Sequence, residues 1–276
     1  VTPGPIANFT SDTVCEGDST TFTDLSQFTP PLGVEIQTWL WDFGDGNTST
    51  DQNPTHLYSN AGVYNAVLIV TDTNGCQGYD TNVVIVDTLP IANFSFTDTI
   101  CLGDTTFFSD LSVNTSGNIN NWQWNFGDGN TSTDINPYHI YSNPGTYTVT
   151  LTVTDDNLCT HTDTQTVIIR PNPIASFTAT TVCVGDTTEL ISTSISDSIY
   201  ANIAGTINSW QWNFGDGNGY GDDLDIIQHA YTSDGPYLVT LIVTDQYGCN
   251  TEVSDSVYVT PGPIANFTSD TVCEGD

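Results

Sequence analysis

Alternating apolar and polar positions recur along the whole chain, and this pattern predicts β-strands. The clearest run is 147–153, Tyr-Thr-Val-Thr-Leu-Thr-Val. Residues two apart share a face of a strand, so this strand has one apolar face and one hydroxyl-rich face. A second run has aromatic residues at Trp39, Trp41 and Phe43 and ends in Gly-Asp-Gly-Asn, a sequence typical of a tight turn. No helix-length window shows a 3.6-residue apolar period, so the chain is predicted to be all-β.

The aromatic strand and its turn occur three times, at Trp41, Trp124 and Trp212, with steps of 83 and 88 residues. Units of this size with many short strands suit sandwiches of about seven strands. We predict domains at 1–88, 89–171 and 172–260. Residues 259–276 repeat 1–18 residue for residue. We therefore predict that 261–276 is the first strand of a fourth domain, which begins the next copy of a super-repeat of 258 residues.

The repeated phrase also carries the residues that most resemble a site. The shared face of the aromatic residues predicts that Trp41, Trp124 and Trp212 lie in the core; a sugar-binding platform is the alternative. A pair of catalytic carboxylates is the alternative role for each turn aspartate. The aspartates recur once per unit without a cleft-forming insertion, so turn formation is favoured, and no enzyme motif occurs elsewhere. These aspartates are Asp45, Asp128 and Asp216.

The charge balance excludes one class of partner. The chain has 33 acidic residues and a single basic one, Arg170, for a net charge of −32. Nucleic acid binding requires cationic side chains, so it is not expected. The acidic surface has two interpretations: a well-solvated surface, or one that recruits Ca²⁺. No other cofactor is predicted, and no membrane-inserting run occurs in this segment.

Seven cysteines fall at two recurring places in the unit. Regular placement without CxxC spacing or histidine partners indicates disulfides rather than zinc, and hence an extracellular or periplasmic location. The chain has neither a starting Met nor a signal peptide, so we expect it to be an internal segment of a longer secreted protein. The first set is Cys15, Cys101, Cys183 and Cys273, and the second is Cys76, Cys159 and Cys249.

The repeated motifs resemble those of PKD (polycystic kidney disease) domains, especially the arrays in large bacterial surface proteins. The resemblance rests on WDFGDGNTST at 41–50, TVTLTVTD at 148–155 and the Asn-Pro-x-His-x-Tyr-Ser-x-x-Gly-x-Tyr run. It implies Ig-like sandwiches, secretion, and roles in spacing, adhesion or carbohydrate contact. We predict a non-catalytic structural segment of an extended extracellular thread on or near a bacterial cell surface. The alternatives are an adhesin that binds surface glycans, or a spacer of a larger secreted enzyme.

Ig-like topology suggests how the cysteines pair. Strand A runs away from the end that carries the last hairpin turn, so Cys15 and Cys76 are expected about 30 Å apart, whereas bridged Cα atoms lie within about 7 Å. A short linker instead brings opposite poles of consecutive domains together. We predict Cys15 with Cys159 and Cys101 with Cys249, which leaves Cys76, Cys183 and Cys273 for neighbours outside this segment. A bridge between Cys15 and Cys76 is the alternative if strand A folds back.

One outward face differs between the units. The outward positions of the predicted central strands are Gln and Thr in the second unit but Leu40, Val67 and Ile69 in the first. An apolar patch on one domain of three suggests a lateral contact with other copies of the chain. The alternative is that the domain's own loops cover the patch.

Overall fold

The computed structural model of the chain describes residues 4–28, 34–97, 100–219 and 223–268. These residues form short and long β-strands and one 3₁₀ turn, η1 (Ser198–Tyr200). Below, the predicted domains 1–88, 89–171 and 172–260 are called the first, middle and third repeats. Within the described residues, no helix is both long and apolar enough to cross a membrane.

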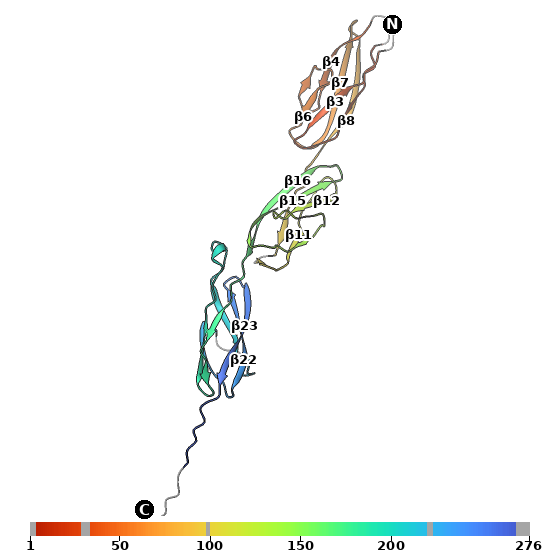
Figure 1. Cartoon of the computed structure of the whole chain (residues 1–276). Helices are drawn as coiled ribbons and strands as arrows, with labels where there is room; N and C mark the ends of the chain where they lie inside the picture. The colour runs from red at the N-terminus through yellow and green to blue at the C-terminus, as the bar shows by residue number, and fades with distance from the viewer. Residues whose placement is uncertain (1–3, 29–33, 98–99, 220–222, 269–276) are drawn as a thin grey trace, which may run out of the picture. The chain divides into compact units, whose positions relative to one another are not determined.

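The first repeat is a sandwich of two sheets (Figure 1). One sheet has the order β2-β8-β7-β4-β5 and the other has the order β1-β3-β6. The long hairpin of β7 and β8 is the centre of the larger sheet, with Gly62 opposite Val86 and Thr71 opposite Gln77. The strands are β1 (Phe9–Ser11), β2 (Val14–Cys15), β3 (Ser19–Asp24), β4 (Ile36–Asp42), β5 (Thr48–Ser49), β6 (Thr55–Leu57), β7 (Gly62–Asp72) and β8 (Gln77–Asp87).

The middle repeat has the same two strand orders, β10-β16-β15-β12-β13 and β14-β11-β9. Its strand β12 pairs with β15 and contains a register shift between Ile119 and Asn121, which matches the shift between Ile36 and Thr38 in β4. The strands are β9 (Phe94–Phe96), β10 (Ile100–Cys101), β11 (Thr106–Asp110), β12 (Ile119–Asn125), β13 (Thr131–Ser132), β14 (Tyr138–His139), β15 (Gly145–Asp155) and β16 (Thr160–Arg170).

The third repeat has a four-stranded sheet, β18-β23-β22-β20, and a three-stranded sheet, β17-β19-β21. After its turn, the third repeat has the sequence Gly-Tyr-Gly-Asp-Asp where the other two repeats have Thr-Ser-Thr-Asp. Among the described residues, no strand stands at the place of β5 and β13. The strands are β17 (Phe177–Ala179), β18 (Val182–Cys183), β19 (Thr187–Ser192), β20 (Ile207–Asn213), β21 (Ile226–Ala230), β22 (Gly235–Asp245) and β23 (Asn250–Thr260).

By packing, the chain falls into two compact units. One is Val1–Phe96 with Phe108–Pro137 and Thr148–Gln165, and the other is Thr97–Phe107 with Tyr138–Tyr147 and Thr166–Asp276. Every bridge and linker contact described below lies within one of these units. The exact boundaries proposed for the three repeats stay a prediction.

The alternating pattern accounts for the cores. Trp41, Trp124 and Trp212 are fully buried, as the shared aromatic face predicts. In the first repeat Trp41 packs edge-on against Phe9 at 5.0 Å and tilted against Phe22 at 5.4 Å, arrangements that aromatic quadrupoles favour. Buried Leu68 and Val70 of β7 complete this cluster. The predicted fold class, tandem Ig-like sandwiches, is thus confirmed.

The upstream tryptophans differ from this expectation. Trp39 was predicted to share the core with Trp41, but it is only half-buried. Its indole Nε1 donates to the Asp24 carboxylate at 2.7 Å, and Trp122 bonds Asp110 in the same way at 2.8 Å. An indole N–H needs a polar partner when water is removed, so this ring closes the end of the core with its nitrogen at the rim.

The first strand also differs from the single strand A on which the prediction of the cysteine pairs was based. Ile6 forms an isolated bridge with Gln27, β1 pairs antiparallel with β3, and β2 pairs parallel with β8 in the other sheet. The Asp12 carboxylate accepts from the Thr21 backbone N at 2.7 Å, where the β1 pairing ends. The chain therefore changes sheet between β1 and β2, which carries Cys15 to the end of β8.

Candidate functional site

Each Gly-Asp-Gly-Asn turn is fixed by backbone geometry that only glycine tolerates well. Gly44 has φ +80°, and a Cβ on it would lie 2.5 Å from the Asn65 carbonyl oxygen. Any side chain at this position would therefore clash with β7 as well as strain the backbone. Asp45 then accepts from the Asn47 backbone N at 3.0 Å, which closes the turn.

The turn aspartate also holds a histidine from the facing sheet. In the first repeat, Asp45 Oδ2 lies 2.8 Å from His56 Nε2, and the His56 ring stacks on Phe43 with centroids 4.1 Å apart. In the third repeat, Asp216 and His229 are 2.7 Å apart, and His229 stacks on Phe214 at 4.0 Å. The middle repeat carries Asp128 and His139 at the same positions, and His139 lies 4.5 Å from the Tyr141 ring.

These contacts set the protonation of the turn aspartates. Burial raises the pKa of Asp45, but hydrogen bonds from His56 and Asn47 outweigh it and leave the pKa below its usual value. Asp216 has a lowered pKa for the same reasons, with His229 and Asn218 as donors. A carboxylate that is ionised and bonded to its own turn is poorly suited to acid–base catalysis. The arrangement ties the two sheets together at the end of the aromatic strand.

A buried tyrosine completes the contact between the sheets. The Tyr231 hydroxyl donates to the Phe214 carbonyl at 3.1 Å, and Tyr58 donates to Phe43 at 3.0 Å. Burial first, then the nearby Asp216 and Tyr237, raise the pKa of Tyr231 to about 12. The phenol therefore stays protonated and keeps donating across the neutral range.

Two disulfides connect consecutive repeats. Cys15 is bonded to Cys159, with Cα atoms 5.6 Å apart, and Cys101 is bonded to Cys249, with Cα atoms 5.4 Å apart. These are the pairs that the argument from opposite poles predicts. Cys76 and Cys183 are free thiols and half-buried, whereas Cys273 lies outside the described residues.

Local structure explains why these pairs form. Cys15 and Cys101 each end a two-residue strand that pairs in parallel with the end of its repeat's last strand, with Cys15 opposite Asp87 and Cys101 opposite Arg170. Each second-set cysteine follows a turn closed by an aspartate. Asp155 accepts from the Cys159 backbone N, and Asp245 from that of Cys249, both at 2.9 Å.

Polar contacts support each linker beside its bridge. Just after the first linker, the Ala92 backbone N donates to His161 Nδ1 at 3.0 Å. In the second, Arg170 donates to the Ile203 carbonyl at 2.8 Å and lies over the Tyr247 ring at 3.5 Å, a cation–π contact. No motif in the sequence assigns a role to His161 or to the segment 192–209. Both roles depend on contacts between segments far apart in the sequence, which no local pattern reveals.

Acidic residues gather beside the first bridge. Burial raises the pKa of Asp87, and the negative charges of Asp155 and Asp156 raise it further. Within the described part of the chain, no group of three or more His, Cys, Asp and Glu side chains is placed to hold a metal ion. A calcium contact stays a prediction from the acidic composition.

The apolar patch of the first repeat lies on the outer face of its larger sheet. Leu40 is opposite Ile69, and Ile69 is opposite Tyr79. Leu40 is 44 % exposed and Tyr79 is 63 % exposed, while Val67 and Ile69 are half-buried. The face continues along the β7–β8 hairpin through Val63, Val83 and Ile85, all exposed.

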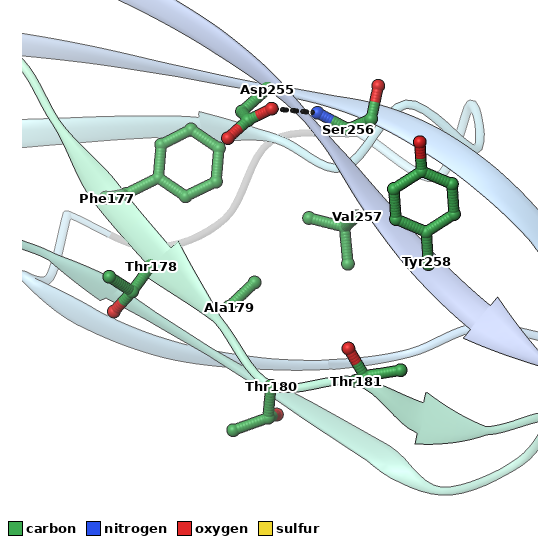
Figure 2. A pocket seen from close by; sticks show the side chains of 9 residues that line it. All are labelled: Phe177, Thr178, Ala179, Thr180, Thr181, Asp255, Ser256, Val257 and Tyr258. Atoms are coloured by element: carbon green, nitrogen blue, oxygen red, sulfur yellow. Dashed lines mark hydrogen bonds between the residues drawn. The ribbon is translucent and has the colours of Figure 1, made fainter.

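A shallow hollow lies in the third repeat. Figure 2 shows Phe177 and Ala179 of β17 on one side and Val257 and Tyr258 of β23 on the other, with the Asp255 carboxylate bonded to the Ser256 backbone N. Its volume is about 280 Å³. No tryptophan lines this hollow, but Trp210 lines a second shallow hollow of about 320 Å³ together with Gln211 and Asp223. The tryptophan platform for sugars stays a predicted alternative.

Comparisons with known proteins agree with the architecture. The family model described as PKD domain matches residues 2–86, 87–169 and 170–261. A microbial collagenase of Vibrio alginolyticus is 44% identical over 80 residues, which is 27% of this chain and 10% of that protein. The pre-pro-metalloprotease PrtV of Vibrio cholerae is 34% identical over 124 residues, which is 44% of this chain and 13% of that protein.

Among solved structures, the PKD1 domain of PrtV is 37% identical; the match covers 29% of this chain and 96% of that domain, with a TM-score of 0.28. The chain thus spans only about a tenth of the length of the curated relatives it matches. Its own three matches cover nearly all of its residues. The chain therefore belongs to the PKD domain family.

Proposed function

We propose that this chain is a non-catalytic structural segment of an extended extracellular thread, made stiff by disulfides between consecutive repeats. The two bridges, Cys15–Cys159 and Cys101–Cys249, are the observation that carries the proposal. A domain that served only to bind a ligand would need no disulfide to the next repeat. A flexible string of domains becomes a stiffer one when each junction is fixed at the linker and again at a disulfide.

The arrangement of the two bridges supports a mechanical role. Residue 101 lies between the ends of the first bridge, and residue 159 lies between the ends of the second, so the two closed loops interlock along the sequence. The repeats themselves use their polar residues for turns and inter-sheet contacts, as Asp45 and Asp216 do. The thread would be secreted and located outside the cell or on its surface.

Copies of the chain are the proposed lateral partners of this thread. A surface with 33 acidic residues and one basic residue repels other copies, so copies can meet only where charge is absent. The outer face around Leu40, Val67 and Ile69 is such a place. Apolar exposure of this kind is typical of an interaction surface. Surface glycans are the alternative partners if the array acts as an adhesin.

A spacer role within a larger secreted enzyme is the second candidate. It is favoured by the relatives, which are a collagenase and a metalloprotease that contain similar domains in a small part of their length. The two roles differ in what flanks the segment. A catalytic domain in the same reading frame would favour the spacer, and further copies of the repeat would favour the thread.

Solution scattering tests the thread. We expect the oxidised chain to scatter as a stiffer and longer particle than the double variant Cys15→Ser, Cys101→Ser at the same pH and salt. The matched control is Cys76→Ser, Cys183→Ser, which removes two thiols but no bridge and should scatter like the parent chain. Equal radii of gyration for the parent and the bridge-free variant would contradict the proposal. Glycan-array binding by the chain would favour the adhesin.

A further inference from the structure

Two cysteines remain free although they stand where bridged cysteines stand elsewhere. Cys183 ends β18, which pairs in parallel with the end of β23, so that Cys183 is opposite Thr260. The Val184 backbone N donates to the Thr260 carbonyl at 2.9 Å, as Glu16 does to Asp87 and Leu102 to Arg170, both at 2.8 Å. The backbone beside Cys183 therefore has the form that presents Cys15 and Cys101 to their partners.

Cys76 has the form of the other half of a bridge. Its backbone N donates to the Asp72 carboxylate at 2.9 Å, which is the distance found for Cys159 and Cys249. Cys76 differs from these two cysteines in how far its side chain is buried. Cys159 and Cys249 are 1% and 0% exposed, whereas Cys76 is only half-buried. Cys76 thus has the shape of a bridged cysteine but lacks the neighbour that covers one.

The chain that enters the first repeat passes directly over Cys76. A Cβ built on Gly4 would lie 3.5 Å from the Cys76 Cβ, and one built on Gly78 would lie 2.2 Å from the Pro5 carbonyl oxygen. Just after the first linker, the corresponding segment contacts the corresponding strand, where the Ala92 N donates to His161. A repeat that preceded residue 4 would therefore reach Cys76 along the same route by which the first repeat reaches Cys159.

The chain that leaves the third repeat has the matching form. Four positions separate the end of the last strand from the next Ile-Ala phrase at all three places, Asp87 to Ile91, Arg170 to Ile174 and Thr260 to Ile264. Ile264 and Phe267 are 94% and 88% exposed, whereas Phe9, at the position of Phe267, is 2% exposed. The residues after Thr260 thus repeat the start of the first repeat without the sheet that buries it.

We propose that Cys183 forms a disulfide with the Cys76 of the following super-repeat copy, along the same chain. This inference extends the proposed thread and rests on it. The two thiols lose two protons and two electrons as the S–S bond forms, and the electrons reduce a disulfide oxidant of the glutathione type to two thiols. The new loop interlocks with Cys101–Cys249, so the bridges continue without a break from one copy to the next.

A chain of two copies in tandem tests this disulfide, and the natural sequence itself joins the copies. Because 259–276 repeat 1–18, residues 1–258 followed by 1–260 give two natural copies in succession. In this chain the Cys76 of the first copy and the Cys183 of the second are changed to Ser, which leaves one candidate pair beyond the four internal bridges. After oxidation by glutathione, we expect no alkylation by maleimide in denaturant, and a Cys183–Cys76 peptide in a non-reducing Asp-N map.

The control and the possible contrary results distinguish a failure of this disulfide proposal from a failure of the proposed thread. Cys76→Ser in the second copy should leave one alkylated thiol, at Cys183, with the four internal bridges unchanged. Two labels on Cys183 and Cys76 of the parent tandem, with the internal bridges intact, would overturn the inference and leave the thread standing. Labels on Cys15, Cys101, Cys159 or Cys249 as well would contradict the thread itself.

Discussion

At the scale of single residues, the turn aspartate links pH to stability. Bonds from His56 and Asn47 keep the pKa of Asp45 below its usual value. A lowered carboxyl pKa contributes stability that is fully present above the unfolded pKa of about 4 and is lost as pH falls through the folded value. The Asp45 carboxylate should therefore contribute its full share at neutral pH and little in strong acid.

We predict that Asp45→Asn lowers the free energy of unfolding by about 1.5–3 kcal/mol at pH 7, the range for hydrogen bonds to a charged group. The loss should shrink as the pH falls below about 4. Urea unfolding of both proteins from pH 7 to pH 2.5 measures it. Asp51→Asn is the control, because Asp51 is bonded through its backbone: its carbonyl accepts from Trp41 and its N donates to Ser49. A loss that stays constant with pH would disprove the linkage.

The half-buried tryptophans allow a matched comparison between repeats. Trp39 donates to a carboxylate, Asp24, at 2.7 Å, whereas Trp210 donates to a hydroxyl, Ser192, at 3.2 Å. Bonds to charged acceptors contribute about 1.5–3 kcal/mol and neutral ones about 0.5–1.5 kcal/mol. We expect Trp39→Phe to cost about 1 kcal/mol more than Trp210→Phe in chemical unfolding. An equal cost would show that lost ring area dominates both.

The residues that sequence analysis predicted correctly are those whose role is local or periodic. Trp41, Trp124 and Trp212 share a strand face with other aromatics, and the glycine-flanked aspartates sit in a turn that sequence alone defines. Trp39 has the same periodicity as Trp41, yet it lies where the core ends and needs a partner for its nitrogen. Periodicity predicts the side of a strand that a residue faces, and not how far the core extends along it.

At the scale of elements, the division of the first strand into β1 and β2 determines where Cys15 lies, and the sequence did not predict it. The change of sheet between β1 and β2 takes Cys15 to the end of β8. A single first strand and the observed pair of β1 and β2 both place Cys15 far from the β7–β8 turn. The predicted cysteine pairs were therefore correct although the predicted strand was not. The signal available in the sequence is weak: Asp12 ends the β1 pairing through one side-chain bond.

The outer face of the larger sheet gives a prediction at this scale. Val67 and Ile69 in β7 correspond to Thr150 and Thr152 in β15. If copies meet at this face, Val67→Asp with Ile69→Asp adds two like charges to an apolar contact and should weaken self-association at least tenfold, about 1.4 kcal/mol. Sedimentation over a concentration series at physiological salt measures it. Thr150→Asp with Thr152→Asp is the matched control. Equal association by both variants would rule out this face.

At the scale of the whole molecule, the fold class followed from the repeated motifs, and the cysteine pairs followed from Ig-like topology and short linkers. The contacts beside the linkers could not be predicted. A motif that occurs three times indicates three copies of one domain. A short linker brings the end of one domain close to the opposite end of the next. The partners of His161 and Arg170 belong to neighbouring segments far away in sequence. Their positions become clear only when the linker's path is known.

Arg170 leads to a protease prediction. It is the only Lys or Arg in the chain and precedes Pro171, and in the structure it is half-buried, bonded to Ile203 and stacked on Tyr247. We expect trypsin to leave the chain whole in the folded state and after denaturation. Pro171→Ala tests the two barriers separately: it should allow cleavage in the denatured chain but not in the folded one. Cleavage of the folded parent chain would contradict the linker geometry.

The interlocked bridges predict how far the chain extends under force. With both disulfides intact, the shortest covalent route from residue 1 to 276 crosses from Cys15 to Cys159, returns to Cys101, crosses to Cys249 and continues to the end, about 99 backbone steps. At about 3.5 Å per step, the unfolded oxidised chain reaches roughly 350 Å, against roughly 950 Å when reduced.

Single-molecule pulling from the two ends measures these limits. Cys15→Ser leaves one bridge and should extend to roughly 450 Å, because the route then runs directly to Cys101, whereas Cys76→Ser should keep the limit of the parent chain. An oxidised chain that reached the reduced length would show that the bridges do not carry the load. Limits at the predicted values would mean that tension passes from repeat to repeat through sulfur even after every sandwich has unfolded, which is the property a thread exposed to shear requires.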